Sequence, residues 1–387
     1  MPEPFVTTLY EQLRQVPDPR SARGKQYSWD FLLMGVSAAL AAGKRKLSEI
    51  SDWVKGHHAE IQQAWERSIE RMPSYATVRR VVLCVDILKL EAAIAAYSQS
   101  LSDSTGTVQP PAEELPLVGQ AIDGKTLRGT VQYKPEDRTP LVSLVRHEDA
   151  VVLAQQRVEN KTNEIRAVPE LLRGRDLQNT VTTMEALLTQ RTMAQHILDQ
   201  KGDYLMVVKD NQHELWTAMD VLFRSSPLPR GEDDRHTVVT RDKAHGRIER
   251  RTLESSVALK DDLDGPGVDQ VLRRTCHRVE IRTGRASEEV TYGITSLGRQ
   301  RASLEQVEQF WRGHWTIENR VHYVRDESMG EDRCQVHTGQ APQALAALRN
   351  GVLNAIRHCG WKNVAAALRH FEASAVEALA LLGVGVS

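Results

Sequence analysis

Cysteine is scarce in this chain, and its scarcity excludes the disulfide-stapled class of small secreted folds. The 387 residues contain four cysteines, Cys84, Cys276, Cys334 and Cys359, which are scattered along the sequence. Thiols this few and this far apart do not form a disulfide framework, and they are typical of a protein of the reducing cytoplasm. A zinc site is disfavoured as well, because Cys334 and His337 have no second tightly spaced chelating pair to complete it.

A large net charge of either sign and a long hydrophobic run are also missing. The chain has 50 basic and 51 acidic residues, for a net charge of −1, so a DNA-binding face has to be a local patch. Two basic patches occur, one from Arg14 to Lys46 and one from Arg235 to Arg251, and each is either such a face or a solvated surface. The longest apolar run, Phe31 to Gly43, is too short to span a bilayer and predicts a buried helix. No signal peptide and no membrane partner are expected.

Length and composition indicate a globular protein of two or three domains. Hydrophobic residues make up 41% and charged residues 26% of the chain. Residues 1–100 predict helices, which form either a DNA-binding head or a cap packed on the rest. The expected divisions are a helical N-terminal domain at 1–100, a linker at 101–117, a first α/β segment at 118–215, a β-rich insertion at 216–300, and helices at 301–387.

The α/β segment has the element order of an RNase H-like core. Strands are predicted at 118–123, 140–146 and 151–158, followed by a helix, a strand at 180–184, a helix and a strand at 204–208. In that fold the first and fourth strands lie side by side. Asp123 and Glu185, which end these two strands, should therefore meet at one edge of the sheet.

The stretch from Val118 to Thr130, V-G-Q-A-I-D-G-K-T-L-R-G-T, is a short strand that ends in a carboxylate at a turn. Lys125 and Arg128 follow Asp123 within the next turns. A carboxylate beside cations at a strand end suits a divalent metal that faces phosphate. The alternative is that Asp123 only begins the turn, as Asp often does.

The predicted helix from Leu304 to about Arg325 carries a polar stripe beside an apolar one. Trp311, His314, Glu318, His322 and Arg325 fall on the polar stripe at spacings of three and four. A tryptophan and two histidines around one carboxylate suggest a functional face. The alternative is an exposed face held by an i,i+4 pair.

Seven ordered motifs resemble DDE transposases of the ISAs type, the H-repeat-associated insertion-sequence family. The resemblance covers nearly the whole chain, and A-I-D-G-K-T-L-R-G at 121–129 resembles the family's first catalytic strand. The other motifs are V-P-D-P-R at 16–20, P-S-Y-A-T-V-R-R at 73–80, N-K-T-N-E-I at 160–165, K-D-N-Q at 209–212, H-G-R-I-E-R-R at 245–251 and W-T-I-E-N at 315–319.

The resemblance implies metal-dependent cleavage and strand transfer of double-stranded DNA at element terminal repeats and target sites. A homodimer on DNA is among the expectations. The resemblance assigns the catalytic and metal-binding carboxylates to Asp123, Glu185 and Glu318, which would hold two Mg²⁺ ions, with Mn²⁺ as a substitute. It also implies that the β-rich insertion enters between the last core strand and the helix bearing Glu318.

Two departures from the family leave alternatives open. The family has T-x-D-A-L at the second carboxylate, whereas this chain has T-M-E-A-L, so Glu185 replaces Asp. The longer arm is compatible with a weakened or silent DNA-binding relic, and a metal-dependent nuclease on the same fold is a third reading. In the related signature Tyr-x₂-Arg-x₃-Glu-x₆-Lys, this chain has Trp311, His314, Glu318 and Arg325.

Cations and amides near these motifs are the candidate DNA contacts. Each is either a contact to DNA or an ordinary surface residue. The candidates are Lys125, Arg128, Lys209, Asn211, Gln212, His245, Arg247, Arg251, His314 and Arg325.

Overall fold

A computed structural model describes residues 7–23, 25–66, 68–103, 116–131, 138–158, 164–225, 234–244, 246–263 and 265–385. The chain divides into two compact units. Unit 1 comprises residues 1–114, 124–163 and 317–387, and unit 2 comprises residues 115–123 and 164–316. The predicted linker at 101–117 and the motif at 160–165 lie mostly outside the described residues.

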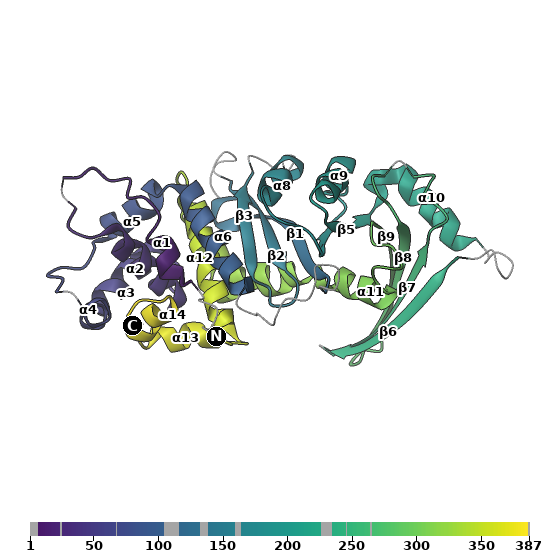
Figure 1. The fold of residues 1–387 in the computed structure, drawn as a ribbon. Helices are drawn as coiled ribbons and strands as arrows, with labels where there is room; N and C mark the ends of the chain where they lie inside the picture. Colours follow the sequence, from purple (N-terminus) through teal and green to yellow (C-terminus); the bar gives the residue numbers. More distant parts are fainter. Residues whose placement is uncertain are drawn as a thin grey trace, which may run out of the picture. The chain divides into compact units, whose positions relative to one another are not determined.

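Unit 1 is built mainly of helices from both ends of the chain. The predicted buried helix is α2 (Trp29–Ala41), and α12 (Ala341–His358) lies against both α2 and α6. The N-terminal helices therefore share a core with the C-terminal ones (Figure 1). The other helices of this core are α1 (Leu9–Leu13), α3 (Leu47–Gly56), α4 (His58–Trp65), α5 (Tyr75–Cys84), α6 (Ile87–Asp103), α13 (Val364–Glu372) and α14 (Ala375–Leu381).

Unit 1 also holds a hairpin and the helix that bears Glu318. The hairpin pairs β2 (Pro140–Arg146) with β3 (Val152–Arg157), as predicted, and α7 (Arg128–Val131) precedes it. The Glu318 helix has π-helical segments η4 (Ile317–His322) and η5 (Val324–Ser328), followed by the short turn η6 (Glu331–Arg333). A π-helical segment is rare and is often found at functional sites.

Unit 2 is organised around a parallel pair of strands. β1 (Val118–Thr126) pairs in parallel with β4 (Thr180–Met184), and β4 pairs in parallel with β5 (Asp203–Val208). Within unit 2 the strand order is β1-β4-β5-β9-β8-β7-β6, and the neighbouring β1 and β4 agree with the predicted RNase H-like order. The helices α8 (Glu164–Leu172) and α9 (Arg191–Asp199) connect the parallel strands.

The β-rich insertion extends this sheet and does not form a separate one. β9 (Ala286–Thr295) runs antiparallel to β5, and β8 (Gln270–Glu280), β7 (Arg247–Ser256) and β6 (His236–Ala244) follow outward. These four strands lie in the stretch at 216–300 that was predicted to be β-rich. The helices α10 (His213–Arg224) and α11 (Leu304–Gly313) pack on these strands (Figure 1).

The core of the insertion is apolar and belongs to unit 2. Leu253, Leu272 and Trp311 are buried together with Val181 and Leu205 of the parallel strands. The insertion is thus part of the same hydrophobic core as β4 and β5. Among the described helices, none is long and apolar enough to cross a membrane.

Candidate active site

The first two predicted carboxylates lie on neighbouring strands of unit 2. β1 and β4 are in register up to the pair Ile122 and Met184, so Asp123 and Glu185 come next along each strand. Both side chains are half-buried, directly beyond residues that are fully buried. The prediction that β1 and β4 lie side by side is confirmed, and it places the two carboxylates at one sheet edge.

Polar side chains behind the two carboxylates fix the register of β1 and β4. Gln120 Nε2 donates to Thr182 Oγ1 at 2.9 Å, and Thr183 Oγ1 donates to the Gln120 carbonyl at 3.1 Å. All three side chains are buried. A slip by one residue would break both bonds inside the core and turn the carboxylates away from this edge.

His314 anchors the end of α11 to β4. Its Nδ1 lies 3.0 Å from Thr183 Oγ1, and because that hydroxyl donates to Gln120, the oxygen can accept from the imidazole. Burial lowers the pKa of His314, although the nearby Glu185 carboxylate acts in the opposite direction. A phosphate contact was predicted here, but the ring is 5% exposed, so in this structure His314 is an anchor and not a surface cation.

The amides of the predicted K-D-N-Q motif hold the segment that follows Glu185. Asn211 Nδ2 donates to the Ala186 carbonyl at 3.0 Å, and Gln212 Nε2 donates to the Thr189 carbonyl. Their amide hydrogens are thus directed to protein backbone in the absence of DNA. Lys209 is exposed, and its charge contributes to lowering the pKa of His314, which places it near the same edge.

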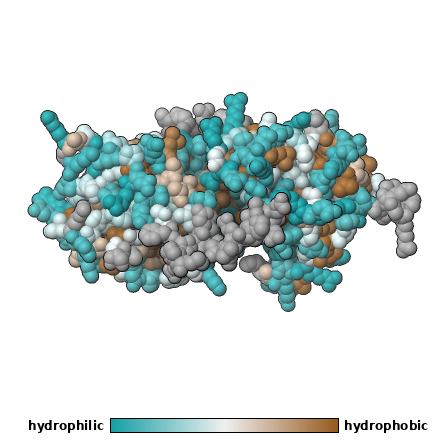
Figure 2. All heavy atoms as spheres, in the orientation of Figure 1, coloured by the Kyte–Doolittle hydropathy of each residue, from teal (hydrophilic) through white to brown (hydrophobic). Residues whose placement is uncertain are grey.

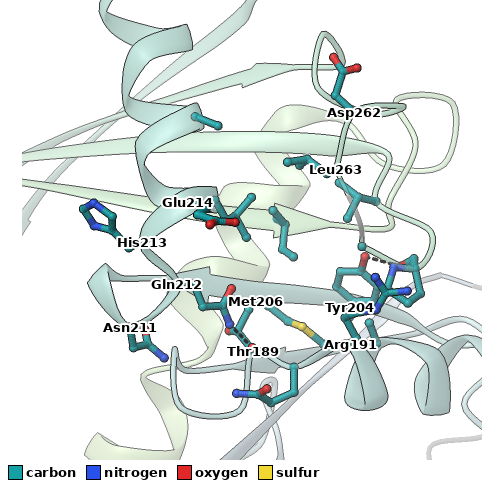
Figure 3. Close-up of a pocket in the computed structure, with 18 residues that line it drawn as sticks. Thr189, Arg191, Tyr204, Met206, Asn211, Gln212, His213, Glu214, Asp262 and Leu263 are labelled. Carbon is teal, nitrogen blue, oxygen red and sulfur yellow. Dashed lines mark hydrogen bonds between the residues drawn. The ribbon is translucent and has the colours of Figure 1, made fainter.

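A cavity of about 730 Å³ adjoins this segment within unit 2. Figure 3 shows Gln212 and Thr189 joined at one side of it, while the Tyr204 hydroxyl donates to the Pro266 carbonyl at 2.7 Å on another side. Tyr204 is fully buried, so its ring face is not open to a ligand. The cavity therefore borders the Glu185 segment, and its other titratable lining residues are Arg191, His213, Glu214 and Asp262.

Glu318 belongs to unit 1 and is half-buried on η4, between the buried residues Ile317 and Val321. The stretch predicted as one helix from Leu304 to about Arg325 is α11 up to Gly313, a turn at His314 and Trp315, and then the π-helical segments that reach Ser328. The convergence of Glu318 with Asp123 and Glu185 stays a prediction. Among the described residues, no group of three or more His, Cys, Asp and Glu side chains could hold a metal ion.

Lys125, two residues after Asp123, is bound to the Glu318 helix within unit 1. Its Nζ lies 2.5 Å from both carboxylate oxygens of Asp326 and 3.9 Å from Asp332. The Lys125 side chain is only 10% exposed, whereas Arg128, 3.7 Å from Asp332, is 81% exposed. Arg128 is thus open to solvent, and Lys125 acts within unit 1 as an ionic link to the Glu318 helix.

Arg325 lies in the core of unit 1, and the predicted phosphate contact at this residue is wrong for this structure. Its side chain is 0% exposed and forms a bidentate pair with Glu331, at 2.9 and 3.0 Å. Arg325 Nη1 also donates to Asn350 Oδ1 at 3.1 Å, and Arg349 lies 3.5 Å from Glu331. Burial alone raises the pKa of Glu331, but the two guanidinium groups hold it below its usual value.

Sequence reasoning did not single out the acidic partners of these cations. Asp326, Glu331 and Asp332 lie on or just beyond the helix, in a segment that reads only as a charged loop. The available signal was the presence of four carboxylates, Asp326, Glu327, Glu331 and Asp332, within seven residues beside a predicted catalytic helix. Partners more than 200 positions away, as for Lys125, leave no local trace in the sequence.

The predicted cations of the insertion fall into two groups. Arg247 is exposed, with its Nε 2.5 Å from Glu249. Arg251 is buried and ion-paired with Glu249, so its predicted DNA contact is not available in this structure. His245 lies outside the described residues.

Two arginines that were not predicted lie on the exposed face of the same hairpin. Arg241 and Arg250 are cross-strand partners in β6 and β7, and both are exposed. Exposed apolar residues, Val239 and Ile248, lie on the same face two positions away along each strand. Figure 2 shows hydrophobic and hydrophilic atoms intermixed where α10 and β6–β9 lie. This face is therefore basic and partly apolar.

Comparisons with known proteins agree with this architecture. The family model described as "Transposase DDE domain" matches residues 115–355, and the one described as "DDE_Tnp_1-associated" matches residues 10–98. "Putative transposase YncI" of Escherichia coli O157:H7 is 28% identical over 362 residues, which cover 92% of this chain and 88% of that protein. "H repeat-associated putative transposase YhhI" of Escherichia coli strain K12 is 27% identical over 354 residues, 89% of each chain.

Among solved structures, the cryo-EM structure of the piggyBac transposase synaptic complex with hairpin DNA aligns with a TM-score of 0.45 at 10% identity, over 97% of this chain and 77% of that one. The family model covers more than half of the chain and spans the strand of Asp123, the strand before Glu185 and the helix of Glu318. The chain belongs to the transposase DDE domain family, together with the H repeat-associated proteins, and is an insertion-sequence transposase.

Proposed function

We propose that this transposase cleaves DNA strands at the ends of its element and joins them to target DNA, with Asp123, Glu185 and Glu318 as its metal-binding carboxylates. The observation that carries the proposal is that Asp123 and Glu185 come directly after Ile122 and Met184, the last paired residues of two parallel strands in register. Glu318 lies within the matched domain, which supports it as the third carboxylate. We infer that it acts on terminal repeats as a homodimer, in the cytoplasm.

The donor set suits a hard divalent cation. Asp123 and Glu185 present carboxylate oxygens, and no thiol stands beside them in either strand, so Mg²⁺ fits better than a soft metal. Two Mg²⁺ ions bound here would activate the attacking hydroxyl and stabilise the departing oxygen. The chain's own part is to hold the carboxylates still: the Gln120, Thr182 and Thr183 bonds fix the strand ends.

The reaction that this arrangement serves has two displacements at phosphorus. In cleavage, a water oxygen bonds to phosphorus as the 3′ oxygen leaves and takes up a proton, which gives a 3′-hydroxyl and a 5′-phosphate. In joining, that 3′-hydroxyl attacks a phosphodiester of the target strand and displaces its 3′ oxygen. Both displacements need the reacting atoms in line, so small shifts of the carboxylates have large effects on rate.

The test of this proposal is the Glu185→Asp variant, which restores the family carboxylate. The shorter arm should raise Mg²⁺-dependent cleavage of a labelled end-repeat duplex by about tenfold or more, because a misplacement of roughly one bond length is costly in such sites. The unmodified protein should gain more from Mn²⁺ than the variant does, since Mg²⁺ demands near-ideal geometry. Cleavage and strand transfer are followed on denaturing gels.

Glu214→Asp is the matched control, since it makes the same change at an exposed residue of unit 2. It should leave the preference between Mg²⁺ and Mn²⁺ unchanged. DNA binding without cleavage by Glu185→Asp in either metal would contradict the proposal and favour a silent DNA-binding relic. Cleavage without joining would favour a nuclease.

We also propose that the exposed face of β6 and β7 contacts the DNA backbone. Replacing both Arg241 and Arg250 by Ala should weaken duplex binding and reduce the slope of log affinity against log salt by about 0.9 for each lost phosphate contact. Arg173, an exposed arginine at the end of α8, is the matched control. Fluorescence anisotropy over a salt series measures both quantities, and an unchanged slope would exclude this face from the DNA contact.

A further inference from the structure

A cleft in unit 1 begins one residue past Glu318 and is not part of the carboxylate site. Its volume is about 740 Å³, and it lies between the outer face of the Glu318 helix, the β2–β3 turn and the segment that joins α12 to α13. Arg320 and Tyr323 contribute from the helix, Asp149 from the turn, and Arg357 and Lys362 from the joining segment. We call it the Tyr323 cleft.

The Tyr323 cleft holds more positive than negative charge. Among the described residues that line it, Asp149 is the one acid, and Arg146 already pairs with that carboxylate through two of its nitrogens. The pKa of Asp149 is accordingly low, because these bonds outweigh the effect of burial. Arg320, Arg357 and Lys362 remain as cations without a lining acid to neutralise them.

The guanidinium groups of Arg320 and Arg357 are held in place by neutral acceptors. Arg320 donates to the carbonyls of Glu148 and Asp149, at 3.0 and 3.3 Å, and Arg357 donates to the carbonyls of Ala150, at 2.5 Å, and Arg320. Within the described part of the chain, neither guanidinium has a carboxylate within salt-bridge distance. Their positions are thus fixed by neutral acceptors, and the Asp149 carboxylate, already paired with Arg146, offsets only part of the charge on Arg357.

The two fixed charges repel each other. Burial and the neighbouring charge of Arg320 lower the pKa of Arg357 to about 9, which still leaves it protonated at neutral pH. Holding two guanidinium groups together at the edge of a cleft costs free energy that an anion placed between them would recover. A phosphate group suits this position, because guanidinium groups bind phosphate through paired hydrogen bonds.

An exposed aromatic ring stands beside these charges. Tyr323 lies on the same helix three residues after Arg320, and its side chain is 61% exposed. A ring this exposed gains little from protein packing, and aromatic rings beside cations form the usual stacking platforms for unpaired bases. A phosphate site and a stacking surface within one cleft match the two ends of a nucleotide.

We propose that the Tyr323 cleft binds an unpaired nucleotide of the DNA substrate, with its phosphate at Arg320, Arg357 and Lys362 and its base against Tyr323. The inference rests on the proposed function, since it takes the bound nucleic acid to be the DNA that this transposase cleaves. Because the cleft starts beside Glu318, the nucleotide would belong to a strand that has separated next to the cleavage site. The cleft would then favour DNA ends that are single-stranded over fully paired ones.

The experiment compares two fluorescent probes, a blunt duplex and the same duplex with a short single-stranded tail, in buffer without divalent metal. The full chain should bind the tailed probe more tightly. Tyr323→Ala should remove about tenfold of that affinity, whereas Tyr323→Phe should keep it, because the phenyl ring still stacks. Lys362→Glu should weaken tailed binding and Lys362→Arg should restore it.

The matched control is Lys89→Glu, which reverses an exposed charge on α6 in the same unit. It should change binding of neither probe. Equal affinity of wild type and Tyr323→Ala for the tailed probe would overturn the inference, and so would equal losses for both probes, which would assign the cleft to duplex backbone. Binding is measured without metal, so an absence of cleavage would count against the proposed function alone.

Discussion

Replacing Asp123 by Asn should reduce Mg²⁺-dependent cleavage of an end-repeat duplex on the order of 10³-fold or more. The amide keeps the shape of the side chain but removes its charge, and a bound metal supplies several kcal/mol of transition-state stabilisation. The loss should be as large in Mn²⁺, since the missing charge affects either ion. Affinity for DNA should stay within about twofold, because the carboxylate faces metal and not phosphate.

Asp176→Asn is the control for Asp123→Asn. Asp176 is exposed in unit 2 just before β4, and its carboxylate accepts only a local bond from the Gln178 backbone at 3.0 Å. The variant should cleave as wild type does. If Asp123→Asn cleaves as much DNA as the control does, the cleavage does not depend on this site and comes from a contaminating nuclease.

Replacing Glu331 by Gln should be among the most destabilising single changes in unit 1. Glu331 is 2% exposed and lies between Arg325 and Arg349, which are 0% and 1% exposed. Its neutralisation leaves two buried guanidinium groups without a counter-charge, which costs about 3–5 kcal/mol in comparable buried pairs. Chemical denaturation should show this loss in the free energy of unfolding of the unit that contains α12.

Glu327→Gln provides the comparison for Glu331→Gln. Glu327 pairs with Arg333 at 3.3 Å, but both side chains are more than half exposed. Solvent screens such a pair, so its loss should cost at most about 1 kcal/mol. Equal stability of the two variants would mean that the Arg325, Glu331 and Arg349 cluster does not hold the Glu318 helix.

The strand positions that sequence reasoning located correctly depend on local patterns. Asp123 and Glu185 each follow a short stretch with the pattern of a strand, and the parallel pairing of those strands follows from the element order. The contacts that the neighbouring side chains make around the two carboxylates depend instead on residues far apart in the sequence. Asn211 and Gln212 appeared as surface amides of a motif, whereas the structure uses them to hold the backbone after Glu185.

Arg325 shows why helical periodicity alone predicted the wrong face of the helix for a side chain. In an α-helix seven residues fall about 20° short of two turns, so Glu318 and Arg325 would share one face. The segments Ile317–His322 and Val324–Ser328 are π-helical. With hydrogen bonds to the fifth residue, each residue turns about 80°, so seven residues rotate the side chain to nearly the opposite face. The sequence carries no simple signal for this widening.

The antiparallel pairing of β5 with β9 has a consequence for how this family can change. An inserted domain on a tether can be lost or exchanged between relatives without harm to its host, but β6–β9 continue the host sheet from β5. Excising them would leave the backbone groups of β5 as an open edge, a template for aggregation, and would uncover Leu205 and Trp311. Evolution can vary the exposed face of these strands residue by residue, but it cannot discard the strands as a module.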